Sequence, residues 1–367
     1  MDYLSLFKKA YDHFNEEVFT QEIYGFASKG LYKYHPYLGF TIRSMGGKYT
    51  PDKILTINSL GLRAVEEPDW NSYRICVIGG SVVFGSYAPS NDFTIPAYIE
   101  RFFKNKKKDK KIQVINCGQG GHVMEQHLVL LHHSIIEKYK PDMVICLAGY
   151  NDFRNFIENK KPGSCRQNEF GKVIETIQRG SMTSVFKDVY LRTFRIRHRS
   201  FNKFLSKLYS KRLIFKRKNN IYSDNNKDLP LDPNEIGKCE KHASYFIQQL
   251  LYQKSLLNGL GIKFVASLQP ALGYGDREIT TEGEKYLIKK ITNSNRGYLE
   301  NLNTYYNAIN KQMLEIKNDQ DFQWLDCENA FNDVNRQIYI DPCHMGDVGN
   351  KIIAEDIFKK TNPTFNS

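Results

Sequence analysis

The sequence lacks the features of a disulfide-stabilised or membrane-spanning protein. Its seven cysteines include no C-x-x-C pair, and Cys76 and Cys146 lie inside apolar runs. An odd, unpatterned set of cysteines indicates reduced thiols. The first nine residues hold no uninterrupted apolar segment of the kind that a secretory signal has, and no run reaches the ~18 apolar residues of a transmembrane helix. We therefore expect a cytoplasmic protein, soluble or bound peripherally at the inner membrane face.

Acidic residues are absent from one long segment. Between Val189 and Ser223 there is no Asp or Glu, whereas eleven Lys and Arg residues fall in that interval. A second basic cluster, Lys104 to Lys111, contains six lysines against one aspartate. The excess positive charge therefore belongs to two segments and not to the whole chain. The chain as a whole is 41% hydrophobic and 13% aromatic, which is sufficient for a folded core.

Short apolar runs rich in β-branched residues alternate with helical patterns from Tyr73 onward. Such alternation predicts a doubly wound α/β sheet made of buried parallel strands. The predicted strands are 74–79, 112–116, 142–148, 262–268 and 322–326. The predicted helices are 92–104, 122–139, 235–259, 296–317 and 346–360.

The chain divides into three predicted parts. Residues 1–70 form an N-terminal extension, whose Gly, Pro and Tyr residues indicate short strands and turns. Residues 71–367 form the α/β domain. Within it, 155–234 shows helical spacing but no strand pattern, and we interpret it as a helical, basic insertion, a cap or an arm.

Polar residues follow the predicted strands where open α/β sheets place their ligands. Ser81 ends the first apolar run after two glycines, and Asp341 and His344 lie three residues apart near the C-terminus. A serine hydroxyl needs a base, and the base needs an anionic partner, so Ser81, His344 and Asp341 are the predicted catalytic residues. The Ser81 N–H, the Gly121 N–H and the Asn151 amide are the predicted oxyanion donors.

These four motifs, in this order, resemble those of the SGNH (GDSL-type) hydrolases. The blocks are Gly79-Gly80-Ser81, Asn116 to Gly121, Gly149-Tyr150-Asn151-Asp152 and Asp341-Pro342-Cys343-His344. The resemblance implies a flavodoxin-like, three-layer α/β/α fold with a five-stranded parallel sheet, and hydrolysis of esters or thioesters with no metal or other cofactor. Gly80 stands where many members have Asp. The segment from Tyr34 to Arg63 is loosely similar to what precedes this domain in bacterial members linked to surface carbohydrate.

Other motif interpretations fail on particular residues. The segment from Gly80 to Ser86 lacks the lysine of a phosphate loop, Val123 replaces the third glycine of a dinucleotide fingerprint, and Gly79 to Val83 is not G-x-S-x-G. Cys343 is adjacent to His344, where a thiol nucleophile would rarely face its base. The last group of candidates has no metal-ligand spacing and is interpreted as solvated or core histidines: His122, His127, His132 and His133.

We predict a serine esterase acting on O-acyl, in the first place O-acetyl, esters of a carbohydrate or glycoconjugate. An O-acyltransferase of surface-polysaccharide assembly is the alternative, and a thioesterase, a lipid esterase or a non-catalytic binding protein are further ones. The basic insertion is interpreted first as a solvated helix face. Its second interpretation is contact with an anionic membrane or acidic polysaccharide, and nucleic acid comes third. The residues for such a contact are Arg195, Arg197, Lys203, Lys207, Lys211 and Arg212.

Overall fold

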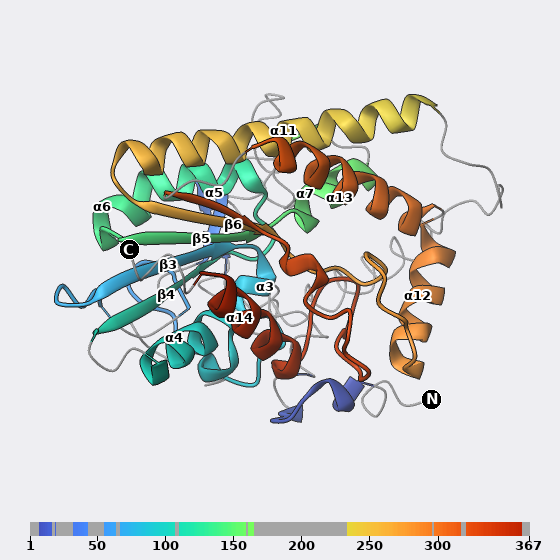
Figure 1. Cartoon of the computed structure of the whole chain (residues 1–367), viewed down its shortest axis with the longest axis horizontal. Coiled ribbons are helices and arrows are strands. Elements are labelled where there is room, and N and C mark those ends of the chain that lie inside the picture. The colour runs from blue at the N-terminus through green and yellow to red at the C-terminus, as the bar shows by residue number, and fades with distance from the viewer. Residues whose placement is uncertain are drawn as a thin grey trace, which may run out of the picture. The chain divides into compact units, whose positions relative to one another are not determined.

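A five-stranded parallel sheet forms the centre of the computed structural model (Figure 1). The structure describes residues 7–16, 19, 32–42, 55–63, 67–106, 110–158, 161–164, 233–295, 297–316 and 321–361. The strands stand in the order β4-β3-β5-β6-β7, the flavodoxin-like order in which the first strand lies inside the second. Their bounds are β3 (Tyr73–Gly79), β4 (Ile112–Gly118), β5 (Met143–Ala148), β6 (Lys263–Leu268) and β7 (Phe322–Leu325). The predicted fold class and strands are confirmed.

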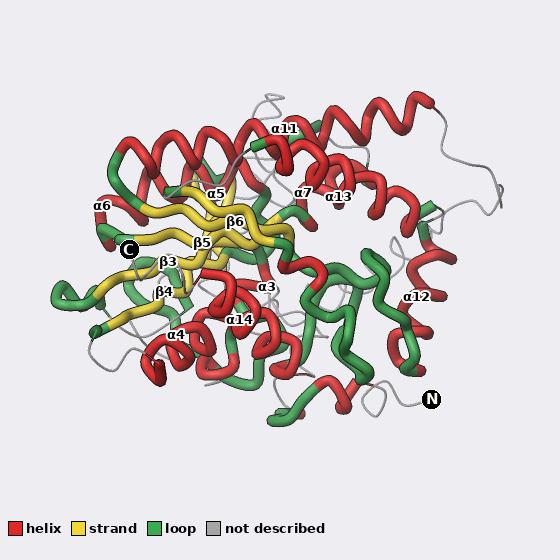
Figure 2. Tube along the Cα trace, in the orientation of Figure 1, coloured by secondary structure: helices red, strands yellow, loops and turns green. Residues whose placement is uncertain are grey.

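Helices cover both faces of this sheet (Figure 2). On one side, α4 (Ile95–Lys106) packs against β4 and against the last helix, α14 (Asp347–Thr361). On the other side, α11 (Pro233–Gly259) packs against α5 (Met124–Leu130), α7 (Tyr150–Ile157) and α13 (Tyr298–Glu315). Every residue of β4 and β5 is buried, which explains why β5 is apolar throughout and why β4 carries only two polar side chains, Gln113 and Asn116, instead of alternating.

Shorter elements complete the described part of the chain. After α5 the backbone continues through a π-helical turn (Leu131–Ile135) into α6 (Ile136–Tyr139). A further helix, α12 (Glu282–Ser294), lies where the sequence pattern predicted none. Three 3-10 turns cover Lys8–Ala10, Asn91–Phe93 and Cys327–Asn329. Within the described ranges, each helix is too short or too polar to span a bilayer.

The described residues of the N-terminal extension include an antiparallel hairpin. Strand β1 (Tyr32–His35) pairs with β2 (Gly39–Ile42), in agreement with the predicted short strands and turns. The predicted insertion, 155–234, lies almost entirely outside the described residues, since α7 ends at Ile157 and α11 begins at Pro233. The six basic residues between Arg195 and Arg212 all fall outside the described ranges.

Candidate active site

Ser81 is delivered by the turn that joins β3 to the short helix α3 (Ser81–Phe84). This turn approaches the sheet too closely for side chains. A β-carbon on Gly79 would lie 2.3 Å from the Leu147 carbonyl oxygen, and one on Gly118 would lie 2.1 Å from the Phe84 nitrogen. The glycines therefore allow α3 to start directly above the ends of the strands. Ser81 is the first residue of α3, so its N–H has no acceptor within the helix.

Ser81, His344 and Asp341 form a continuous chain of short contacts. His344 Nε2 lies 2.6 Å from Ser81 Oγ, and His344 Nδ1 lies 2.6 Å from Asp341 Oδ2. The other carboxylate oxygen of Asp341 accepts the backbone N–H groups of Cys343 at 2.9 Å and His344 at 2.7 Å. The loop thus fixes the carboxylate, the carboxylate fixes the imidazole, and Nε2 is left to accept the serine proton. The predicted triad is assembled.

The charge interaction between Asp341 and His344 makes the imidazole more basic. Burial by itself lowers the pKa of His344, but the Asp341 carboxylate outweighs it, with a smaller contribution from Cys343, and holds this pKa well above its ordinary value. For Asp341 burial acts in the opposite direction, yet His344 and the two backbone N–H groups lower the pKa to about 2. Asp341 is therefore the anion that stabilises an imidazolium at His344.

Of the predicted oxyanion donors, Asn151 lies against the turn that carries Ser81. Asn151, in the first turn of α7, donates one N–H of its amide to the His122 carbonyl oxygen at 2.8 Å. A β-carbon on Gly80 would lie 2.6 Å from that amide nitrogen, so Asn151 sits directly against the residue before Ser81. The nitrogen carries a second N–H, which is a suitable donor to an oxyanion. Gly121 has φ +80°, a conformation that favours glycine.

The N-terminal extension holds the loop that carries Gly121. Gln119 accepts from the Thr41 hydroxyl at 3.2 Å and from the Ile42 N–H at 3.1 Å. His122 Nε2 lies 3.0 Å from the Phe40 carbonyl oxygen and therefore carries the proton of a neutral ring. Burial lowers the pKa of His122 to about 4, in keeping with that neutral state. Residues of β2 are thus supports of the site, which motif reasoning did not detect.

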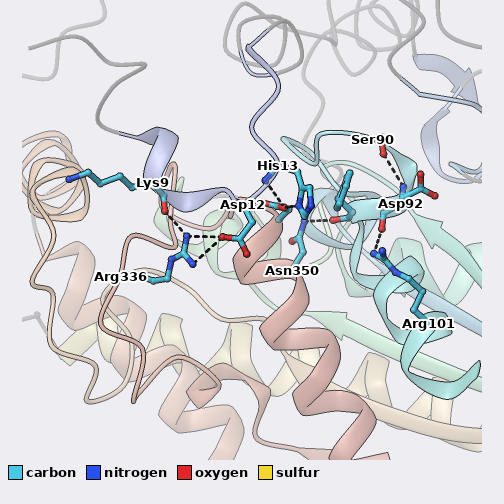
Figure 3. Close-up of polar contacts among 10 residues, drawn as sticks. Lys9, Asp12, His13, Ser90, Asp92, Arg101, Arg336 and Asn350 are labelled. Atoms are coloured by element: carbon cyan, nitrogen blue, oxygen red, sulfur yellow. Dashed lines mark hydrogen bonds and ion pairs between the residues drawn. The ribbon is translucent and has the colours of Figure 1, made fainter. Parts of the chain in front are cut away.

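The N-terminal turn also holds the loop that carries His344. Asp347, three residues beyond His344, accepts the backbone N–H of Asp12 at 2.9 Å and of His13 at 3.1 Å. Arg336 reaches the same turn, with its guanidinium 3.2 Å from Asp12 Oδ1 (Figure 3). Sequence reasoning missed these supports, because no motif links positions more than three hundred residues apart.

The other histidines singled out in the sequence serve as core or surface residues. His122 and His127 are buried, whereas His132 and His133 are exposed. Burial lowers the pKa of His127 well below its ordinary value. Asp152, the last residue of the third motif, accepts the N–H of Met124 at 3.1 Å and so caps the start of α5. The burial of the four histidines agrees with their interpretation as solvated or core residues.

Comparisons with known proteins give distant structural likenesses. No protein-family model matches the chain, and no curated protein matches it. An acetyl-xylooligosaccharide esterase from Geobacillus Stearmophilus is 13% identical with a TM-score of 0.42, over 78% of this chain and 93% of that one. A two-domain esterase active on acetylated mannans is 10% identical with a TM-score of 0.37, over 81% and 50%. A protein described as a GDSL-like lipase from Bacteroides ovatus is 14% identical with a TM-score of 0.39, over 83% and 56%.

This chain spans about half the length of the last two proteins. The strand order and the Ser81–His344–Asp341 contacts agree with the fold and the catalytic residues that the sequence resemblance to the SGNH hydrolases implies.

Proposed function

We propose that this protein is a serine esterase that hydrolyses O-acyl esters, in the first place O-acetyl esters of a carbohydrate. The observation that carries the proposal is the chain of two 2.6 Å contacts from Ser81 through His344 to Asp341. A hydroxyl bonded to an imidazole whose other nitrogen faces a carboxylate is an activated nucleophile. The carbohydrate part follows only from the sequence resemblance of the region before Ser81.

The first half-reaction forms an acyl-serine. Ser81 Oγ attacks the ester carbonyl carbon while His344 Nε2 takes the hydroxyl proton. The carbonyl oxygen becomes an anion within reach of the Ser81 N–H, the Gly121 N–H and the Asn151 amide. As the tetrahedral intermediate collapses, His344 gives its proton to the departing alcohol oxygen. The C–O bond of the ester breaks, and the acyl group stays on Ser81.

The second half-reaction regenerates the serine. Water gives a proton to His344 Nε2 and attacks the acyl-serine carbonyl, so that the same donors hold the second oxyanion. His344 then returns the proton to Ser81 Oγ, and the carboxylic acid leaves. Each oxyanion donor of this kind contributes about 3–4 kcal/mol to the barrier reduction in comparable sites.

Labelling and turnover together test the proposal. A fluorophosphonate probe should modify wild-type protein at Ser81, and p-nitrophenyl acetate should be hydrolysed. Ser81→Ala should lose labelling and at least ~10³-fold in rate, because nucleophile removal leaves only oxyanion and binding contributions. Ser255→Ala is the matched control, since Ser255 is exposed and its hydroxyl bonds back to the Leu251 carbonyl oxygen on the same helix, α11. A folded Ser81→Ala protein with wild-type activity would refute the nucleophile.

The substrate class needs a separate measurement. Acetylated oligosaccharides, acyl-thioesters and long-chain lipid esters should be compared by kcat/KM, with the free acid measured with and without a sugar acceptor. We expect the acetylated sugar to be preferred and acetate release to be independent of the acceptor. A preference for thioesters or long chains would remove the carbohydrate assignment. A fall in free acetate when the acceptor is added would assign transfer in place of hydrolysis.

A further inference from the structure

Cys343 lies between Asp341 and His344 on the C-terminal loop, and no bond forms or breaks at its thiol in the proposed hydrolysis. Its Sγ is 3.6 Å from His344 Nδ1, the nitrogen that also faces Asp341 Oδ2 at 2.6 Å. One ligand atom from each of these three residues lies within 4.8 Å of the other two. Among the residues that the structure describes, no other group of three His, Cys, Asp or Glu side chains meets that condition.

The backbone of the loop creates this convergence. Asp341 Oδ1 accepts the N–H groups of both Cys343 and His344, which folds the loop tightly around one carboxylate oxygen. The second oxygen, Oδ2, is left to point at the imidazole. The side chains of His344 and Asp341 keep 17% and 26% of their surface exposed, whereas Cys343 is only 6% exposed, so an ion would approach from the side of the imidazole and the carboxylate.

A thiolate, an imidazole and a carboxylate are the ligands of zinc in proteins. With Zn–S of ~2.3 Å and Zn–N of ~2.0–2.1 Å, a tetrahedral ion holds its sulfur and nitrogen roughly 3.6 Å apart. The observed Sγ to Nδ1 distance is 3.6 Å. The same geometry separates nitrogen and oxygen by about 3.4 Å. The Asp341 carboxylate must therefore draw back by less than ~1 Å when an ion replaces the bridging proton.

We propose that Asp341, Cys343 and His344 form an inhibitory zinc site, which uses the residues of the proposed esterase to switch it off. Zn²⁺ binds His344 Nδ1, Asp341 Oδ2 and the Cys343 thiolate, and water completes the tetrahedron. The imidazole keeps its single proton, now on Nε2, while the thiol releases its proton to solvent. The ion stays Zn²⁺ throughout, so no electron is transferred.

Binding at Nδ1 abolishes catalysis through the tautomer of His344. In the active state Nδ1 carries the proton and Nε2 accepts from Ser81. With zinc at Nδ1, Nε2 carries the proton and has no lone pair for the serine. The carboxylate that stabilises the imidazolium is occupied as well. The inference depends on the proposed function for its consequence, although the ion site itself can be detected without any turnover.

The inhibition experiment uses the full chain after treatment with EDTA. Hydrolysis of p-nitrophenyl acetate is followed while ZnCl₂ is added, with each variant normalised to its own metal-free rate. We expect wild type and Cys239→Ala, a buried cysteine on α11, to be inhibited equally, and EDTA to restore the rate. Cys343→Ala and the near-isosteric Cys343→Ser should raise the inhibitory zinc concentration more than about 10-fold, since even indirect partners of a metal contribute ~10–100-fold.

A spectroscopic experiment separates this inference from the proposed function. Co²⁺ bound through Cys343 should give the near-ultraviolet charge-transfer band of a cobalt–thiolate bond in wild type and in Ser81→Ala, which needs no esterase activity. The band should be missing in Cys343→Ser and unchanged in Cys239→Ala. A Cys343→Ser protein with the same band, or with the same sensitivity to zinc as wild type, would overturn the site. Inhibition by Mg²⁺ at equal concentration would do so too, because Mg²⁺ avoids thiolate ligands.

Discussion

The side chain of His13 is bonded to Asp347, a residue at the opposite end of the chain and only three positions after His344. His13 Nδ1 lies 2.7 Å from Asp347 Oδ2, and the Asp347 side chain is only 1% exposed. Two backbone N–H groups of the same N-terminal turn complete the environment of this carboxylate. The carboxylate therefore connects the start of the described chain to the loop that carries His344.

Replacing Asp347 should damage both stability and turnover. We expect Asp347→Ala to lower the free energy of unfolding by at least ~2 kcal/mol, because each hydrogen bond to a charged group contributes ~1.5–3 kcal/mol. We also expect a lower kcat at nearly unchanged KM, since the loop would hold His344 less well against Ser81. Urea unfolding and steady-state kinetics measure the two effects.

His13→Ala is a milder variant for comparison with Asp347→Ala, because it removes only one of the hydrogen bonds to the Asp347 carboxylate. The His13 side chain is 58% exposed, and the backbone bonds to Asp347 survive its removal. We expect this variant to lose about 1 kcal/mol or less, in the range of exposed ion pairs. A His13→Ala protein as damaged as Asp347→Ala would show that the side chain, and not the backbone of the turn, carries the connection.

The pH profile of hydrolysis should report the basic imidazole of His344. Its pKa is raised well above 6.5 by Asp341, and only the deprotonated ring accepts the Ser81 proton. The rate kcat/KM should therefore fall as the pH drops through that pKa, and still be rising above pH 6.5. Asp341→Asn should move the rising limb to lower pH and reduce kcat by about 10⁴-fold, as when the third member of such a triad is changed. If kcat/KM of the wild type falls only well below pH 6.5, Asp341 does not raise the pKa of His344.

Local patterns in the sequence were sufficient for the strands and the triad. The strand β3 ends in an apolar run, and the glycines that close β3 and β4, Gly79 and Gly118, are required because a β-carbon there would meet other atoms at less than 2.5 Å. Asp341 and His344 lie three residues apart, so one loop brings them together. Ser81 joins them because parallel strands end at the same edge of the sheet. Each of these relationships has a local signature.

The supports of the site have no such signature. His13 and Gln119 are ordinary polar residues in the sequence, and their partners, Asp347 and β2, are fixed only by the tertiary structure. Helix α12 was missed for a related reason. Its few buried side chains, among them Leu287 and Ile291, give a weak apolar stripe beside an equally buried Glu284, which Arg277 neutralises at 2.9 Å. Long-range pairing overrides local pattern at these places.

A methyl group at Gly80 should reduce turnover through Asn151. The added β-carbon of Gly80→Ala would lie 2.6 Å from the Asn151 amide nitrogen, closer than real contacts allow, so the amide must shift. Loss of one oxyanion donor reduces kcat by about 10²–10³-fold, and we expect a decrease of that order with a smaller change in KM. Gly237→Ala is the control, because nothing lies within 4 Å of a β-carbon there. Unchanged kcat in Gly80→Ala would remove Asn151 from the oxyanion site.

The buried acid Glu328 should make the stability of the fold depend on pH. Glu328 is 5% exposed, Asn310 donates to its Oε1 at 2.7 Å, and within the described residues its Oε2 has no hydrogen-bond partner. Burial raises the pKa of this carboxyl to about 7 from 4.5. The folded state therefore binds the proton more tightly than the unfolded state. The associated stability is present in full below pH 4.5 and is lost as the pH rises through about 7.

Glu328→Gln tests this dependence because it removes the ionisation and retains the shape. Above pH 8 we expect the variant to be more stable than wild type by up to about 3 kcal/mol, the free energy of a shift of this size. At pH 5, where the wild-type carboxyl is protonated, the two proteins should differ little. Urea unfolding at both pH values measures the difference. Glu282→Gln, at a side chain 74% exposed, is the control and should change stability at neither pH. If Glu328→Gln is no more stable than wild type at pH 8, the carboxyl must be ionised without penalty in the folded protein, through a partner that accepts its charge.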